Sequence, residues 1–72
     1  MFDKEIFAQR VRELRLEKGW TQEELAEKLG LKKQTISGIE NKNHTTKLET
    51  VIKLAKFFGV SVDYLLGLTD KR

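Results

Sequence analysis

The sequence predicts a compact all-α fold of five helices in one domain, and three observations lead to this class. Apolar residues recur at helical spacing in five segments, and no segment reads as a strand. Glycine follows four of the five segments, at positions 19, 30, 59 and 67, where helices commonly end. At 72 residues, helix packing is the economical way to form a core. We expect helices over residues 3–18, 22–29, 33–41, 47–58 and 62–66.

Composition narrows the class of protein. Charged residues make up 35% of the chain and hydrophobic residues 39%, which is typical of a globular protein rather than a disordered or membrane one. No apolar run approaches the roughly 20 residues that span a bilayer, and the acidic first segment is not a secretory signal. The absence of cysteine excludes disulfides and thiolate metal sites. These features predict a cytoplasmic protein.

The net charge of +3 is unevenly distributed. Residues 1–30 hold six basic and seven acidic groups, whereas residues 31–56 hold six basic and only two acidic groups. The positive excess therefore falls on the third predicted helix and the segment after it, where a phosphate backbone would lie. An ordinary solvated lysine face is the alternative.

The helix over residues 3–18 is predicted from an apolar stripe of Phe7, Val11 and Leu14. Trp20 follows Gly19 and is expected to fill the corner between the first two helices. Stacking of this tryptophan on a nucleic-acid base is the alternative.

Residues 21–41 predict two short helices joined by a tight turn. Thr21 and Glu24 form a capping-box pattern at the start of the first helix, and Gly30 ends it. The second helix turns Ile36 and Ile39 inward. Its opposite face carries polar, small and mostly uncharged residues: Lys33, Gln34, Ser37, Gly38 and Asn41. Such groups can hydrogen-bond base edges and phosphates, so this segment looks like a helix-turn-helix with residues 33–41 as the recognition helix.

The last two helices are predicted from caps and apolar stripes. Thr46 and Glu49 form a second capping-box pattern, and Ser61 caps the short helix over residues 62–66. Phe57 is expected to point away from the core, and residues 68–72 to form a frayed tail or the start of a linker. The residues expected to be buried are Leu48, Val51, Ile52, Ala55, Phe58, Val62, Leu65 and Leu66.

Several motifs in matching order resemble the lambda-repressor-like (Cro/Xre) helix-turn-helix family. They are VRELR, GWTQEELAEKLGL, QTISGIEN and LETVIKLAKFFGVSVDYLL, and together they cover nearly the whole chain. The family usually has a glycine where Lys42 stands and often a proline before the fourth helix, and this chain has no proline. These departures bear on the path of residues 42–45. Chains of this family often carry a further domain beyond a point like residues 68–72.

The resemblance implies that the third helix enters the major groove of DNA and that its first residues read bases. Carried over by position, the base-reading residues are Lys33, Gln34, Ser37 and Gly38. Lysine can donate to guanine O6 and N7, and glutamine can pair with adenine. Gly38 would allow close approach to a base, or it is merely tolerated there. For Lys33 and Gln34 the alternative is ordinary helix surface.

Further residues are expected to contact phosphates or to hold the fold. The expected phosphate contacts are Thr21, Gln22, Asn41, Lys42 and Asn43. The resemblance also implies a partly buried ion pair between Arg15 and Glu40, although Glu40 could alternatively be a catalytic acid. His44 is expected to be solvated or near a phosphate, since the sequence offers it no metal-binding partners.

These residues predict a sequence-specific regulator that binds double-stranded DNA without a cofactor or metal. It would act as a repressor, binding a palindromic operator as a homodimer through a patch of Phe57, Tyr64 and Leu68. An antitoxin-like or other protein-interaction module with secondary DNA binding is the alternative. An enzyme is not expected, because the chain has no cysteine, one histidine and no converging pair of carboxylates.

Overall fold

The computed structural model describes residues 3–42 and 47–72, which fold into five α-helices and contain no strand. The helices are α1 (Lys4–Glu17), α2 (Gln22–Leu29), α3 (Lys33–Glu40), α4 (Leu48–Phe58) and α5 (Val62–Leu66). Each boundary lies within one residue of its predicted position, so the all-α, five-helix class is confirmed. Among these residues no helix is long and apolar enough to cross a membrane.

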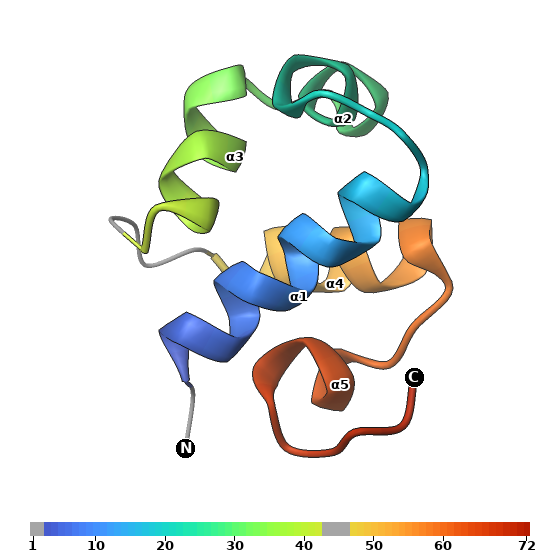
Figure 1. Cartoon of the computed structure of the whole chain (residues 1–72). Coiled ribbons are helices and arrows are strands. Elements are labelled where there is room, and N and C mark those ends of the chain that lie inside the picture. The colour runs from blue at the N-terminus through green and yellow to red at the C-terminus, as the bar shows by residue number, and fades with distance from the viewer. Residues whose placement is uncertain (1–2, 43–46) are drawn as a thin grey trace.

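All five helices surround a single core. In Figure 1, α1 crosses the front of the molecule, α2 and α3 lie above it, α5 lies below it and α4 lies behind it. The largest side chains that are completely buried come from every helix: Val11, Leu25, Ile36, Ile39, Leu54 and Leu65. Burying each of these contributes about 1.5–3 kcal/mol relative to exposure. Because Ile36 and Ile39 of α3 are among these residues, the core fixes the position of α3.

Side-chain caps explain why three of the helices begin where they do. Asp3 Oδ1 accepts hydrogen bonds from the amides of Glu5 and Ile6, at 2.9 and 3.2 Å. Ser61 Oγ accepts from the Tyr64 amide at 3.0 Å. The predicted capping box is present at α2: Thr21 Oγ1 accepts from the Glu24 amide at 3.0 Å, and Glu24 Oε1 accepts from the Thr21 amide at 2.9 Å.

We expect the α2 cap to be measurable as stability. Thr21→Ala should lower the free energy of unfolding by about 1 kcal/mol, because one amide of the first turn loses its acceptor.

The hydrogen bond from the Thr21 amide, together with the Thr21 hydroxyl, holds the pKa of Glu24 below its ordinary value of 4.5. This contribution is present above the ordinary pKa and is lost as the pH falls through the folded-state value. Urea denaturation from pH 7 to pH 3 should show a smaller loss of stability in Glu24→Gln than in the unmodified protein.

The start and the buried face of α4 differ from the prediction. The N-cap is Lys47 and makes no side-chain cap bond, and the predicted cap Thr46 lies outside the described residues. Leu48 is 67% exposed and Ile52 is 38% exposed, so the prediction that they are buried was wrong. The buried residues are Thr50, Val51, Leu54 and Ala55. Apolar residues lie around most of α4, so the pattern alone did not select the face that packs on its neighbours.

Trp20 packs at the corner between α1 and α2, as predicted. Its ring centroid lies 5.4 Å from that of Phe57 and 6.5 Å from that of Phe58, and the Lys28 ammonium sits 4.7 Å from it. Trp20 is partly buried against the core. Phe57 is 39% exposed, and its ring covers Trp20 rather than standing free.

The last residues are anchored, so the prediction of a frayed tail was wrong. Arg10 donates to the carbonyl oxygens of Tyr64 and Thr69 and to Asp70 Oδ1, the last two at 2.6 and 2.8 Å. Arg72 pairs with Glu17, and its carbonyl oxygen accepts from the Ser61 amide at 2.7 Å. Figure 1 shows this segment returning along the molecule toward the end marked C. The side-chain contacts of Arg10 and Arg72 join residues more than 50 positions apart, so no local pattern could have revealed them.

Candidate nucleic-acid interface

Helices α2 and α3 form the predicted helix-turn-helix. Gly30 adopts a left-handed conformation (φ 67°, ψ 29°) at the end of α2, which lets the Leu31 amide donate to the Ala26 carbonyl at 2.8 Å. The Lys53 ammonium donates to the Leu29 carbonyl at 3.1 Å and so satisfies another carbonyl at this helix end. Lys53 is one of the six basic residues in the positively charged segment 31–56. Its bond to α2 means that it also serves the fold.

A buried ion pair braces α3 against α1, as the family resemblance implied. Arg15 Nε and Nη2 donate to the two carboxylate oxygens of Glu40, at 2.8 and 2.9 Å. The Arg15 side chain is 10% exposed and that of Glu40 is 4% exposed. Hydrogen bonding to Glu40 raises the pKa of Arg15 above its ordinary value. This two-bond geometry fixes the angle of α3 as well as its distance.

The same ion pair reaches the corner and the start of α2. Arg15 Nη1 donates to the Trp20 carbonyl at 2.6 Å, and Gln22 Nε2 donates to Glu40 Oε1 at 3.2 Å. Glu40 is thus fully engaged in holding three helices together, which leaves no basis for a catalytic role. The Trp20 carbonyl and Lys53 were not identified from the sequence, because side chain-to-carbonyl contacts of this kind carry no local signal.

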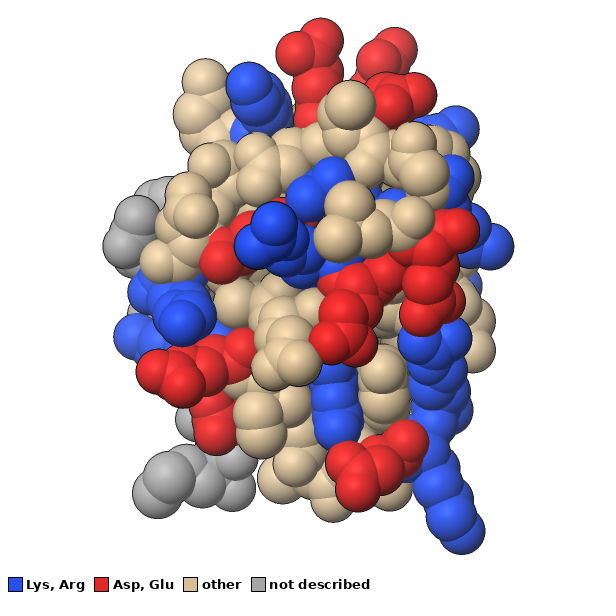
Figure 2. Space-filling model, in the orientation of Figure 1, with Lys and Arg blue, Asp and Glu red and all other residues tan. Residues whose placement is uncertain are grey.

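The outer face of α3 presents a short row of polar side chains. Lys33, Gln34 and Asn41 are exposed and Ser37 is partly exposed, while Ile36 and Ile39 are buried on the other side. Asn41 Nδ2 donates to Ser37 Oγ at 3.2 Å. In Figure 2, the surface over α3 at the upper left is mostly tan, and blue and red groups are interleaved over the rest of the visible face.

Gly38 differs from its predicted position on this face. It is buried, so the expectation of an exposed base-reading position was wrong. Gly38 is followed in the chain by Ile39, which is also buried. With no side chain of its own, it is covered by the residues around it.

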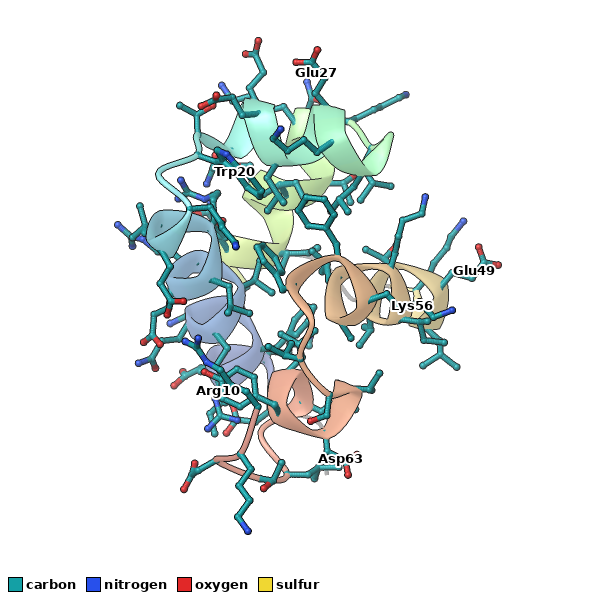
Figure 3. All side chains as sticks on the ribbon, turned by 90° about the vertical axis from the view of Figure 1, so that its right-hand side faces the viewer. Arg10, Trp20, Glu27, Glu49, Lys56 and Asp63 are labelled. Atoms are coloured by element: carbon teal, nitrogen blue, oxygen red, sulfur yellow. The ribbon has the colours of Figure 1, made fainter. Side chains whose placement is uncertain are left out.

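The start of α2 lies beside the start of α3. A depression there is lined by Thr21, Gln22 and Lys33 together with Arg15 and three glutamates, Glu23, Glu24 and Glu27. The structure therefore brings one predicted base-reading residue together with two predicted phosphate-binding residues. The Gln22 amide side chain is bonded to Glu40, so a phosphate at this helix end would meet the free main-chain amides of the first turn. Glutamates project from α2, and Figure 3 labels Glu27 at its outer edge.

The other predicted site residues are placed as follows. Lys42 is exposed just after α3, whereas Asn43 and His44 lie outside the described residues. In the described part of the chain, no three histidine, aspartate or glutamate side chains gather as they would around a metal ion.

The predicted dimer patch does not form as expected. Leu68 is 56% exposed, but Tyr64 is buried at 7% exposure, because its ring faces α1 with the Arg10 guanidinium 4.2 Å from its centre. Figure 3 shows Arg10 on α1 beside α5. The exposed apolar pair that sequence reasoning missed is Leu48 and Ile52, one turn apart on α4. Their i, i+4 spacing is visible in the sequence, where it predicts a buried stripe, but both side chains are exposed.

Comparison with known proteins identifies the protein family to which this chain belongs. The family described as helix-turn-helix matches residues 11–65, and the chain belongs to it. The uncharacterized transcriptional regulator YobD of Bacillus subtilis (strain 168) is 43% identical over 65 residues, which are 90% of this chain and 58% of that protein. The phage CTXphi transcriptional repressor RstR of Vibrio cholerae is 43% identical over 62 residues, or 86% of this chain and 56% of that protein.

Two further similarities bear on function. Antitoxin HipB of Escherichia coli (strain K12) is 43% identical over 49 residues, covering 68% of this chain and 56% of that protein. A restriction-modification controller protein, C.Esp1396I, solved as a tetramer with its 35 base-pair operator, has a TM-score of 0.74 and 31% identity, covering 90% of this chain and 86% of that one. The chain spans about half the length of the curated relatives it matches. The lambda-repressor-like resemblance is confirmed, and these relatives are named as regulators, a repressor or an antitoxin rather than enzymes.

Proposed function

We propose that this chain is a sequence-specific regulator of transcription that binds double-stranded DNA and represses by occupying an operator. The observation that carries the proposal is the rigid presentation of Lys33 and Gln34 on α3, whose far end is clamped by the Arg15–Glu40 pair. A base-reading helix must be held in a fixed orientation, because hydrogen bonds to base edges depend on angle. The repressor RstR and the operator-bound controller support the same assignment.

Lys33 and Gln34 would read base edges in the major groove, and Ser37 would contact the groove one turn further on. Ser37 is held by Asn41, so the two act as one unit. Thr21 and the first amides of α2 would bind a phosphate on one side, and Asn41 and Lys42 would bind the backbone beyond the end of α3. No cofactor or metal takes part, and the site of action is the cytoplasm.

Binding to DNA is tested by titrating labelled duplexes of mixed sequence, with single strands of the same sequences as the control. The proposal predicts tighter binding to the duplex and a linear fall of log K with log salt concentration. Each phosphate that a lysine or arginine neutralises should contribute about −0.9 to the slope, and Lys42 is the charged residue among the proposed phosphate contacts. Equal binding to single strands, or binding that does not depend on salt, would contradict the proposal.

We also propose that the protein acts as a homodimer on a palindromic operator. A single module offers a small interface of about 600–1,000 Å², so useful specificity favours two copies on adjacent half-sites. Leu48 and Ile52 on α4 are the best-exposed apolar pair on one helix face and could meet their symmetry mates. The controller protein that resembles this chain was solved as a tetramer on its operator, which supports self-association.

The dimer predicts a specific effect of Leu48→Glu. A charge at each copy of position 48 should repel across a two-fold axis, so the variant should sediment as a monomer. It should bind a two-half-site duplex about as weakly as a single half-site. Leu68→Glu adds the same charge at another exposed leucine and serves as the matched control. Dimers in Leu48→Glu, or monomers in both variants, would exclude this face as the interface.

The antitoxin-like alternative has some support from the HipB match, but not more than the regulator has. A protein-binding module would be favoured by a large apolar groove. The depression beside α2 is instead lined by charged and polar residues. The DNA-binding proposal therefore accounts better for the surface.

A further inference from the structure

One residue in the described part of the chain has a backbone conformation that its side chain disfavours. Five described residues lie in the left-handed region of φ, and four of them are glycines: Gly19, Gly30, Gly59 and Gly67. The fifth is Lys42, with φ at 63°, directly after the C-cap residue Asn41 of α3. In this conformation the Lys42 amide donates to the Ile39 carbonyl at 3.2 Å, which helps to satisfy the end of the helix.

The left-handed backbone conformation at position 42 does not favour lysine over other residues. A left-handed backbone brings the Cβ atom of any residue except glycine too close to a carbonyl oxygen, and asparagine tolerates the conformation better than most. The chain ends α2, α4 and α5 on glycine and has asparagine on both sides of Lys42. A glycine at position 42 would therefore make the folded state about fivefold more favourable relative to the unfolded state.

Packing does not require a lysine at position 42 either. Lys42 is exposed, and in residues 3–42 and 47–72 no ion pair or hydrogen bond engages its ammonium. The lysines with a described structural contact are different ones: Lys53 bonds the end of α2, and Lys28 lies over Trp20. Strained residues persist mostly where they serve a function.

We propose that Lys42 is retained because its ammonium contacts a DNA phosphate beside the end of α3, so that folding stability is lost in exchange for affinity. This inference rests on the proposed function and adds a trade-off to it. The contact carries no sequence information, because a phosphate presents the same charge beside every base. Lys42 should therefore strengthen binding to all duplexes alike, and the strain should be removable without harm to the fold.

The test measures stability and DNA binding on the same variants. Lys42→Gly removes both the charge and the strain, and Lys42→Asn removes the charge while tolerating the backbone. Lys42→Arg keeps both and is the matched control. Urea unfolding gives the stability, and titration of a mixed-sequence duplex over a salt series gives the affinity and the salt slope.

We expect Lys42→Gly to lower the unfolding equilibrium constant about fivefold and to make the salt slope shallower by about 0.9. Lys42→Asn should show the same change in slope, and Lys42→Arg should show neither change. A Gly variant that is no more stable, or that keeps the slope of the unmodified protein, would overturn the inference. If the unmodified protein itself shows no salt-dependent duplex binding, the proposed function fails first, and that result comes from the unmodified protein alone.

Discussion

Replacing Glu40 with alanine is expected to lower the free energy of unfolding by about 3–5 kcal/mol, because Arg15 is then left buried without its carboxylate. The Arg15 side chain is only 10% exposed and that of Glu40 only 4%. The planar guanidinium of Arg15 donates two hydrogen bonds to the carboxylate of Glu40, one from Nε and one from Nη2. A domain of this size has a total stability of only about 5 kcal/mol, so about 0–2 kcal/mol should remain and up to about half of the molecules should be unfolded. Urea denaturation followed by the fluorescence of Trp20 measures the change.

The double variant Arg15→Met, Glu40→Leu is the control for this prediction. It removes both charges and replaces them with apolar groups, so it should recover most of the stability lost in Glu40→Ala. A loss of less than about 1 kcal/mol in Glu40→Ala would show that the pair behaves like a solvent-exposed one. The account of how α3 is held would then be wrong.

Gln34→Ala is expected to remove discrimination of about 1–3 kcal/mol at particular positions of the DNA site, while leaving the fold intact. Gln34 is exposed at the start of α3, and no described contact holds its side chain, so its loss costs the protein little. Competition between duplexes that differ at one base pair measures the effect. Specificity should relax at one or two positions of each half-site.

Gln9→Ala makes the same chemical change on the exposed face of α1 and is the matched control, because in residues 3–42 and 47–72 the Gln9 side chain bonds Glu13 alone. It should leave the base preferences unchanged. If Gln34→Ala instead weakens binding to all sequences equally, Gln34 positions the protein on the backbone and does not read a base.

Local signals in the sequence were enough to predict the helices. Caps such as Thr21 and Ser61 and stop signals such as Gly30 and Gly59 act within a few residues, so they appear directly in the sequence. The predicted boundaries follow from them. The Arg15–Glu40 pair is a long-range contact, and it was predicted because the family resemblance placed both residues.

What could not be predicted depends on how the helices pack. Tyr64 was placed in an exposed patch, but α5 turns its ring toward α1, where Arg10 covers it. Leu48 and Leu54 are equally apolar, and only contact with the neighbouring helices decides that Leu54 is buried. Polar side chains that bond distant carbonyl groups, such as Arg10 and Lys53, have no periodic pattern. Functional surfaces that depend on such packing can therefore be identified only from the structure.

The most direct test of the central claim is selection from a randomised duplex library followed by sequencing, repeated at several salt concentrations. The account predicts a motif with two-fold symmetry, half-sites about one helical turn apart and affinity that falls steeply with salt. If no motif emerges even at low salt, sequence-specific DNA binding by α3 would be contradicted.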